Sequence, residues 1–360
     1  MEKVRAQYDK FPYPKVSWLA HINPASVAHA NYESGAALVY RVFQKHENKK
    51  ILLLGCGTTE PAAFAIAHPH TRVTAVDFSS KSISNAKRFC KLHLKFNVDF
   101  HKVDLLNFCE QNQSQFDYIH CYGVIHHLSD PQKGFAAIRR ALKPNGFARV
   151  MVYSTSSRWR IQKIQALAKL LNINTAKNLT ALLSTLPIDH PLRLTFEMHP
   201  EKNNHSGFTD AFLHACENSF TLTELEKTLN ANDLILHHWD FSQNIIKLLL
   251  QTPGYTTFEK IKWLEASDQW PTSFNFWVSP LKKVNHTTNS YITNPLISWR
   301  FKTNLHSTLL RNTIKLTPQH QKCLALCKVL PLQKNIIPPE LHNTLYELVQ
   351  ARFILEVNHQ

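Results

Sequence analysis

The sequence predicts an α/β fold with an open parallel sheet, and two patterns support this prediction. The first is a strand, turn, helix and strand unit, in which Ile51–Leu54 and Val73–Val76 flank a glycine turn and a helix with Pro61 in its first turn. Ile51–Leu54 is apolar without alternation, as expected for a strand buried on both faces of a parallel sheet. The second pattern is repetition, because strand and helix signals alternate as far as Tyr153 and make five βα units.

The turn after the first strand is the predicted ligand site. Glycines at Gly55 and Gly57, on either side of Cys56, let the backbone turn sharply and approach a ligand without a Cβ in the way. The helix that follows points its free N–H groups at the same place. Asp77 ends the second strand about twenty residues later, where a carboxylate can accept both hydroxyls of a ribose.

Two kinds of cofactor use such a turn. A nicotinamide dinucleotide would favour a third glycine where this chain has Glu60, and its pyrophosphate would meet a negative charge there. S-adenosylmethionine (SAM) carries no phosphate and needs only the turn, the helix N-terminus and the acid. The sequence therefore favours SAM.

The remaining units follow in order. The expected elements are a helix over 80–94, a strand over 98–103, a strand over 116–120, a loop over 121–131, a helix over 132–142, a turn over 143–146 and a strand over 147–153. Asp104 follows a strand end and would either accept a hydrogen bond from an adenine amino group or cap the next helix. The loop carries His126 and His127 at the carboxyl edge, where open α/β sheets bind ligands.

Composition limits the alternatives. No apolar stretch approaches the length of a membrane span, and no signal-peptide core follows Met1, so we expect a soluble, cytoplasmic protein. Seven scattered cysteines without paired spacing indicate reduced thiols and no metal site. The net charge is +15, but residues 151–280 hold 11 Lys and Arg against 12 Asp and Glu. A basic solvated surface is therefore favoured over a nucleic-acid footprint.

Before the first strand, residues 7–14 form an aromatic and proline segment. A residue before proline is biased toward extended backbone, so we expect no helix here. A short amphipathic helix is expected over 36–46. The segment would be a strap packed on the domain, a lid over the cofactor, or both.

Later motifs resemble a known family. GVIHHLSDPQKG from Gly123, ALKPNG from Ala141 and VMVY ending at Tyr153 follow the glycine turn and Asp77, and this arrangement resembles the class I SAM-dependent methyltransferases. The opening YDKFPYP from Tyr8 resembles a bacterial subgroup of that family, as do FTLTEL from Phe220 and FNFWV from Phe274. The resemblance covers about residues 7–280.

The resemblance implies a seven-stranded Rossmann-like sheet, with strand six over 234–239 and an antiparallel strand seven over 274–278. It also implies a set of cofactor-binding residues, namely Gly55, Cys56, Gly57, Asp77, Phe78, Asp104, Leu105, Tyr122 and Gly123. The family usually has an acid at the position of Leu53 and a glycine at that of Thr59. These two departures could lower SAM affinity.

Three regions follow from this reading. Residues 1–48 form the strap or lid, 49–280 the methyltransferase domain, and 281–360 a small, basic, mainly helical and winged-helix-like unit of three short helices. Within the domain, residues 158–219 form a helical insertion that would cap the pocket, with helices over 161–171 and 179–186. Its Arg193, Asp210 and His214 would touch substrate or be ordinary surface and capping residues. A capping box over 221–224 opens the next helix.

The predicted function is methyl transfer from SAM to a small-molecule acceptor. The alternatives are a non-catalytic, regulatory SAM-fold protein that binds an acidic partner, and an RNA methyltransferase, which is disfavoured because residues 121–124 lack an Asn-Pro-Pro-Tyr motif. A base is needed only if the acceptor is protonated. His126 or His127 would then take the proton. Otherwise these histidines would only shape the pocket. If one is the base, the rate should fall as the pH drops through the ordinary histidine range.

Overall fold

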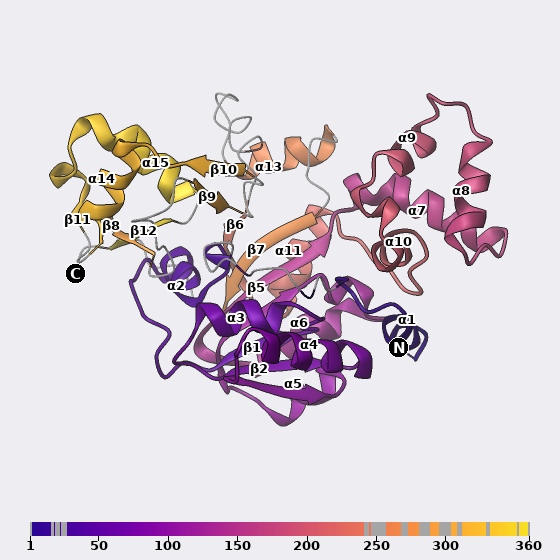
Figure 1. The fold of residues 1–360 in the computed structure, drawn as a ribbon, viewed down its shortest axis with the longest axis horizontal. Helices are drawn as coiled ribbons and strands as arrows, with labels where there is room; N and C mark the ends of the chain where they lie inside the picture. The colour runs from indigo at the N-terminus through magenta and orange to yellow at the C-terminus, as the bar shows by residue number, and fades with distance from the viewer. Residues whose placement is uncertain are drawn as a thin grey trace.

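The computed structural model describes residues 2–15, 18, 22, 27–240, 245, 257–267, 273–280, 289–294, 304–307, 312–328, 332–350 and 353–358. Its centre is a seven-stranded sheet in the order β3-β2-β1-β4-β5-β7-β6 (Figure 1). The strands are β1 (Ile51–Leu54), β2 (Val73–Asp77), β3 (Val98–Lys102), β4 (Phe116–Tyr122), β5 (Leu142–Tyr153), β6 (Ile235–Trp239) and β7 (Ser273–Ser279). β7 pairs antiparallel with both β5 and β6, whereas β1 to β5 pair in parallel.

The core lies on both faces of this sheet. Every residue of β1 is buried, and its side chains alternate between two apolar clusters. Leu52 and Leu54 face the cluster formed with α5 (Leu105–Gln111), α6 (Pro131–Ala141), α11 (Leu222–Ala231) and α13 (Thr257–Ala266). Ile51 and Leu53 face the cluster formed with α2 (Tyr32–Tyr40), α3 (Glu60–Ala67) and α4 (Ser80–Leu92). The prediction of a strand buried on both faces is confirmed.

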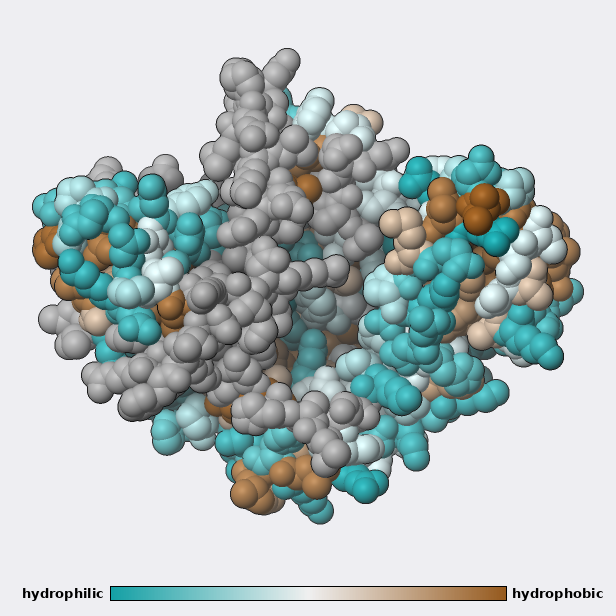
Figure 2. All heavy atoms as spheres, turned by 45° about the horizontal axis from the view of Figure 1, so that its top comes forward, coloured by the Kyte–Doolittle hydropathy of each residue, from teal (hydrophilic) through white to brown (hydrophobic). Residues whose placement is uncertain are grey.

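The insertion between β5 and β6 is helical and has its own core. It contains α7 (Thr155–Leu170), α8 (Ala176–Ser184), α9 (Pro191–Glu197), a short 3-10 turn at Pro200–Asn203 and α10 (His205–Phe212). Their apolar faces form a separate cluster that includes Ile164, Leu179 and Phe212. The insertion projects from one side of the sheet (Figure 1), and hydrophobic residues, coloured brown, reach its surface (Figure 2). Ile188 and Met198 of the insertion are both exposed.

The described part of the C-terminal region is mixed. It holds α14 (Pro318–Leu326), α15 (His342–Gln350), two 3-10 turns, a hairpin of β9 (Asn304–Ser307) and β10 (Asn312–Lys315), and a sheet of β11 (Leu332–Gln333), β8 (Asn289–Thr293) and β12 (Ile354–Asn358). The sheet packs on α2, where Arg41 forms an ion pair with Glu356 at 2.6 Å. Asn294 joins the same contact, because its amide donates to the backbone carbonyl of Ala28.

Several local predictions were wrong. Residues 7–10 belong to helix α1 (Glu2–Lys10), because the proline restriction acts only from Phe11 onward. Helix α2 covers 32–40, and Arg41 ends it with a left-handed φ of 57°. The turn over 143–146 is a bulge inside β5, since Leu142 pairs with Phe116 and Phe147 with Tyr118. The third C-terminal helix is instead strand β12, which pairs with β8.

Other expectations are confirmed. The capping box is complete, because the Thr221 hydroxyl accepts from the Glu224 amide while the Glu224 carboxylate accepts from the Thr221 amide. All seven cysteines are free thiols. Among the described residues, no helix is both long and apolar enough to cross a membrane.

Candidate functional site

A cavity of about 340 Å³ opens at the carboxyl edge of the sheet. Its described lining comes from three parts of the chain that are far apart in sequence: the loops after β1 to β4 together with β5, the N-terminal segment, and α10. The lining residues are Val4, Tyr8, Tyr13, Pro14, Gly55, Cys56, Gly57, Thr59, Glu60, Val76, Asp77, Phe78, Ser82, Val103, Asp104, Leu105, Tyr122, Gly123, Val124, His127, Leu128, Met151, Tyr153 and Asp210. The volume is in the range of small-molecule sites.

The glycine turn forms one wall of the cavity. Gly55 and Gly57 have φ of 63° and 56°, which an L side chain adopts only with strain. A Cβ on Gly57 would lie 2.8 Å from the Tyr13 carbonyl oxygen, and one on Gly55 would collide with Val124. The backbone at this turn is therefore close to its neighbours on one side and open to the cavity on the other.

Asp77 lies beside this turn. Its carboxylate accepts from the Gly57 amide at 3.0 Å and from the Ser79 amide at 2.9 Å, which fixes the orientation of the side chain. Burial raises the pKa of Asp77 to about 6, and these two amides lower it. Each oxygen keeps a lone pair for a further donor in the cavity.

Asp104 serves as a helix cap and also lines the cavity. Its Oδ1 accepts from the Leu106 amide at 2.8 Å at the start of α5, so the capping alternative is confirmed. Its other oxygen accepts no hydrogen bond within the described structure. A role toward an adenine amino group is compatible with the cap.

The two departures from the family pattern have local explanations. Leu53 is fully buried in the apolar cluster between the sheet and α2 and α3, where its side chain adds to the core. Thr59 has a φ of −117°, which any residue adopts, so a glycine is not required there. Neither change closes the cavity.

His126 and His127 lie on a 3-10 turn, Ile125–His127, and differ in surroundings. His127 lines the cavity, and its Nδ1 donates to the Cys216 carbonyl at 3.0 Å, which leaves the lone pair on Nε2. His126 is fully buried against Tyr153 at 3.9 Å between ring centroids, and neither of its ring nitrogens has a hydrogen-bond partner among the described residues. Burial lowers the pKa of both, to about 4 for His127.

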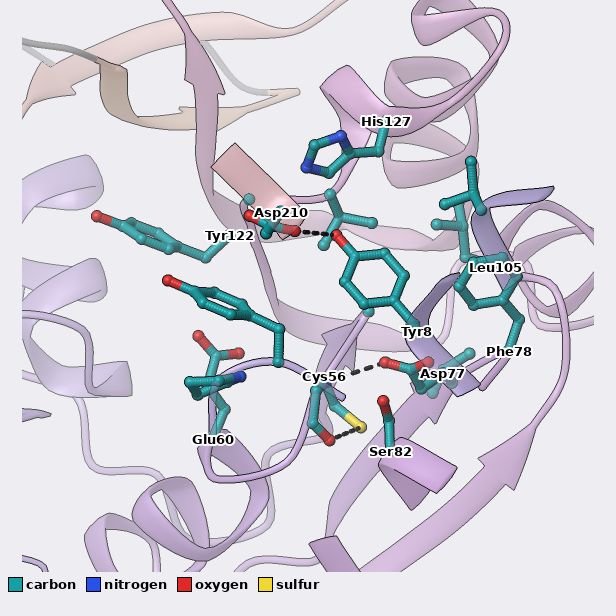
Figure 3. A pocket seen from close by; sticks show the side chains of 18 of the residues that line it. Tyr8, Cys56, Glu60, Asp77, Phe78, Ser82, Leu105, Tyr122, His127 and Asp210 are labelled. Carbon is teal, nitrogen blue, oxygen red and sulfur yellow. Dashed lines mark hydrogen bonds between the residues drawn. The ribbon is translucent and has the colours of Figure 1, made fainter. Parts of the chain in front are cut away.

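A series of hydrogen bonds between side chains crosses the cavity opposite Asp77. Tyr8 donates to Asp210 Oδ1 at 2.7 Å, and the Tyr8 hydroxyl lies 3.2 Å from His214 Nε2. His214 Nδ1 accepts from the Cys216 amide, so its neutral ring carries the proton on Nε2 and donates to Tyr8. Figure 3 shows Tyr8 between Asp77 on one side and Asp210 and His127 on the other.

The structure brings together most of the predicted residues. All nine expected cofactor contacts line the cavity, as does His127. His126 lies behind it, and Arg193 caps α8 by donating to the Ser184 and Leu186 carbonyls. Sequence reasoning missed Ser82, Met151 and Tyr153. For Met151 and Tyr153 a signal existed, since both lie among the last three residues of β5, at the ligand edge.

One group of side chains could also hold a metal. The ligand atoms of His127, Asp210 and His214 lie within 4.8 Å of one another. Asp210 and His214 are already joined through Tyr8. Among the described residues these three form the only such group, and the sequence analysis did not anticipate it.

Comparison with known proteins gives the family. Residues 52–148, which run from β1 into β5 and include the glycine turn, Asp77 and the histidines, match the family model described as a methyltransferase domain. The chain carries a class I SAM-dependent methyltransferase domain. The strand order with an antiparallel β7 agrees with this assignment.

Relatives of the methyltransferase domain cover different shares of the chain. A protein of Synechococcus sp. described as uncharacterized is 26% identical over 65% of this chain and 58% of its own length. A ubiquinone biosynthesis O-methyltransferase of Aromatoleum aromaticum is 33% identical over 27% of this chain and 41% of its own length. The chain thus spans about three fifths of the first relative and less than half of the second.

Solved structures extend the similarity in fold beyond the methyltransferase domain. The structure of PKMT2 from Rickettsia typhi covers 97% of this chain and 77% of its own length, with a TM-score of 0.59 and 16% identity. A second structure of that protein, in complex with AdoHcy, has a TM-score of 0.56. At this identity the likeness shows the fold alone.

Proposed function

We propose that this protein binds SAM in the 340 Å³ cavity and transfers its methyl group to an acceptor that enters beside α10. One observation carries the proposal. A glycine turn with two positive φ values, a helix N-terminus and a buried carboxylate converge on one side of a single cavity. SAM needs these groups, and Glu60 in the same wall opposes a pyrophosphate.

Specific residues would hold each part of the cofactor. Gly55, Cys56 and Gly57 would leave room for the methionine moiety, and Asp77 would accept the ribose hydroxyls. Phe78, Asp104 and Leu105 would bind the adenine, with Tyr122 and Gly123 closing the far side. Bound SAM supplies an activated methyl group on a sulfonium, so alignment and exclusion of water would provide much of the catalysis.

We further propose that His127 faces the acceptor and that His126 supports the loop. His127 presents an unprotonated Nε2 to the cavity, since its Nδ1 proton is used by Cys216. A nitrogen in this state can accept a proton from an acceptor group. His126 packs under Tyr153 and cannot reach the cavity.

Two segments would close the site. The N-terminal segment contributes Tyr8, Tyr13 and Pro14 to the lining, and the insertion contributes Asp210. They also contact each other, because Gln7 accepts from the Ala215 amide at 3.0 Å and Tyr13 donates to Glu201 at 3.3 Å. We infer that residues 1–48 act as a lid and 158–219 as a cap that sets acceptor choice.

The names of similar proteins support methyl transfer. The Aromatoleum aromaticum protein is an O-methyltransferase of ubiquinone biosynthesis by name, and the Rickettsia typhi structure contains AdoHcy. We retain a small-molecule acceptor as the general proposal and a cytoplasmic site of action as an expectation.

Calorimetric titration of the purified protein with SAM and with its demethylated product tests the proposal. Both should bind, and Asp77→Ala should weaken both by roughly ten to a hundredfold through loss of charge-assisted hydrogen bonds. Gly57→Val should abolish binding, because its Cβ would meet the Tyr13 carbonyl. Asp99→Ala is the matched control, since Asp99 lies on β3 outside the cavity and pairs with Arg72. No SAM binding by the wild type would favour the non-catalytic alternative.

A further inference from the structure

The charged side chains that line the cavity, including its acceptor side, are negative. Of the described lining residues, four are carboxylates and none is Lys or Arg. Glu60, Asp77 and Asp104 belong to the loops assigned to the cofactor, so Asp210 is the one charged group left for the acceptor. The charge of the nearby Arg158 acts on Asp210, but its guanidinium does not line the cavity, because it is paired with Glu217 at 3.0 Å and packs on the Tyr153 ring.

Asp210 is buried, but only one of its two carboxylate oxygens accepts a hydrogen bond within the described structure. It is 8% exposed, and its Oδ1 accepts from Tyr8 at 2.7 Å. Within the described structure its Oδ2 accepts no hydrogen bond, and the residue lines the cavity. A buried carboxylate is stable when a cation or further donors complete its shell, so this oxygen favours a positively charged, N–H-bearing ligand.

Aromatic rings surround the same space. Tyr8 and Tyr13 line the cavity, and the Tyr8 ring centroid lies 6.4 Å from that of His127. Tyr153 also lines it, but its ring already packs against the Arg158 guanidinium at 3.9 Å. The hydroxyls of Tyr8 and Tyr13 are held by Asp210 and Glu201, so these rings have fixed orientations. Phenol rings attract cations through their faces, and a carboxylate among several rings is a recognition site for ammonium groups.

We propose that the acceptor is an alkylamine, bound as its ammonium ion by Asp210 and the tyrosine rings. This proposal rests on the proposed function, since it names the acceptor class for the same cavity. For transfer, the ammonium held by Asp210 gives one proton to His127 Nε2, and the freed nitrogen lone pair forms the new N–C bond. The C–S bond of the sulfonium breaks with its electron pair left on sulfur, which yields the methylated ammonium and the neutral thioether.

The alkylamine acceptor is either a free amine or a lysine side chain of a peptide, and the experiment distinguishes the two. The protein is first saturated with S-adenosylhomocysteine, and binding of n-butylammonium, 1-butanol and butyrate is compared by ligand-observed NMR. n-Butylammonium should bind at least about tenfold more tightly than either isostere, as a buried charge pair requires.

Labelled methyl transfer from SAM is then measured to n-butylamine and to a lysine-containing peptide, with a norleucine peptide as the control. Transfer to the peptide alone would identify a lysine side chain as the source.

Variants connect the selectivity to Asp210. Asp210→Asn should lose the preference for n-butylammonium, whereas Asp189→Asn, an exposed aspartate of the same insertion, should keep it. Circular dichroism checks that both fold, and the wild-type comparison stands without them. Equal or tighter binding of butanol or butyrate, with S-adenosylhomocysteine bound, would overturn the amine assignment and leave the methyltransferase proposal intact. Failure to bind S-adenosylhomocysteine would instead overturn the proposed function.

Discussion

The Tyr8 hydroxyl donates a 2.7 Å hydrogen bond to Asp210 across 202 residues of sequence, and this bond joins the N-terminal helix to the insertion over the cavity. Burial and the Asp210 charge raise the pKa of Tyr8 well above its ordinary value, so the phenol remains a donor at all physiological pH values. Tyr8→Phe should lower the free energy of unfolding by about 1–3 kcal/mol, because Asp210 loses its donor while buried.

Chemical denaturation measures this change. Tyr346→Phe is the matched control, since Tyr346 is about half exposed on α15 and should change stability by less than about 0.5 kcal/mol. Equal effects of the two substitutions would contradict the structural role of the Tyr8 hydroxyl.

SAM affinity should depend on the ionisation of Asp77. Burial raises its pKa to about 6, and ribose hydroxyls donate to the charged form. Above that pH the carboxylate is ionised and the affinity should be constant with respect to this group. As the pH falls through 6 the carboxylate becomes protonated, and the affinity should drop by up to about tenfold per pH unit.

Calorimetry at several pH values checks the Asp77 prediction. The neutral amide of Asp77→Asn should give weaker binding without the drop near pH 6. A drop that persists in this variant would have to come from another group.

His126 and His127 should have different roles. The pKa of His127 is about 4, so its Nε2 stays unprotonated between pH 6 and 8. A rate that uses this nitrogen should be flat there and fall only as the pH approaches 4, below the ordinary histidine range expected from sequence. If His127 is the base, His127→Asn should reduce turnover by about 10² to 10⁴ with SAM affinity intact.

His126 should behave differently, because both of its ring nitrogens are buried and lack a hydrogen-bond partner in the described part of the chain. His126→Phe removes this cost and keeps a ring against Tyr153, so stability should be unchanged or increased. The exposed His70→Asn serves as the neutral control for both assays. A larger turnover loss in the His126 variant than in the His127 variant would reverse the assignment.

The domain and the cofactor wall could be predicted because both depend on local patterns. Ile51–Leu54, the two glycines and Asp77 lie within one βαβ unit, where chain direction alone brings them together. The acceptor side could not be predicted in the same way. Tyr8, His127 and Asp210 meet only after the insertion folds back over the sheet, and no spacing in the sequence encodes that contact.

Local errors have similar causes. Helix α1 continues through Gln7 and Tyr8 because the proline restriction acts only on the residue before each proline, and these residues lie on a helix that contacts α4. Residues 354–358 are a strand because β8 offers an edge to pair with. In both cases tertiary contacts outweigh local propensity.

Closure of the site should be visible in hydrogen exchange. If residues 2–15 and the insertion cover the cavity, amides in α1 and near Asp210 should exchange more slowly with SAM and acceptor bound than without them. The amide of Ala215 is a direct reporter, since it donates to Gln7. Protection limited to residues 50–130 would contradict a lid and cap role.

The last prediction concerns the buried ion pair behind the cavity. Arg149 Nε donates to Asp240 Oδ2 at 2.8 Å, and Asp240 also accepts from Trp277 at 3.1 Å. Both charged side chains are almost fully buried, and the Arg149 guanidinium lies 4.7 Å from the centre of the Tyr122 ring in the cavity wall. Arg149→Met should therefore lower the free energy of unfolding by about 3–5 kcal/mol, because the buried Asp240 carboxylate loses the guanidinium that donates to its Oδ2.

A double variant separates the charge from the packing. Arg149→Met with Asp240→Asn removes both charges and keeps an acceptor for Trp277, so it should be more stable than Arg149→Met alone. Denaturation of both variants and the wild type measures the coupling. If the double variant is no more stable than the single one, packing of Arg149 against Tyr122 and Trp277 contributes more than its charge. SAM affinity should then fall together with stability, because Tyr122 would lose the Arg149 guanidinium that packs on its ring and holds it in the cavity wall.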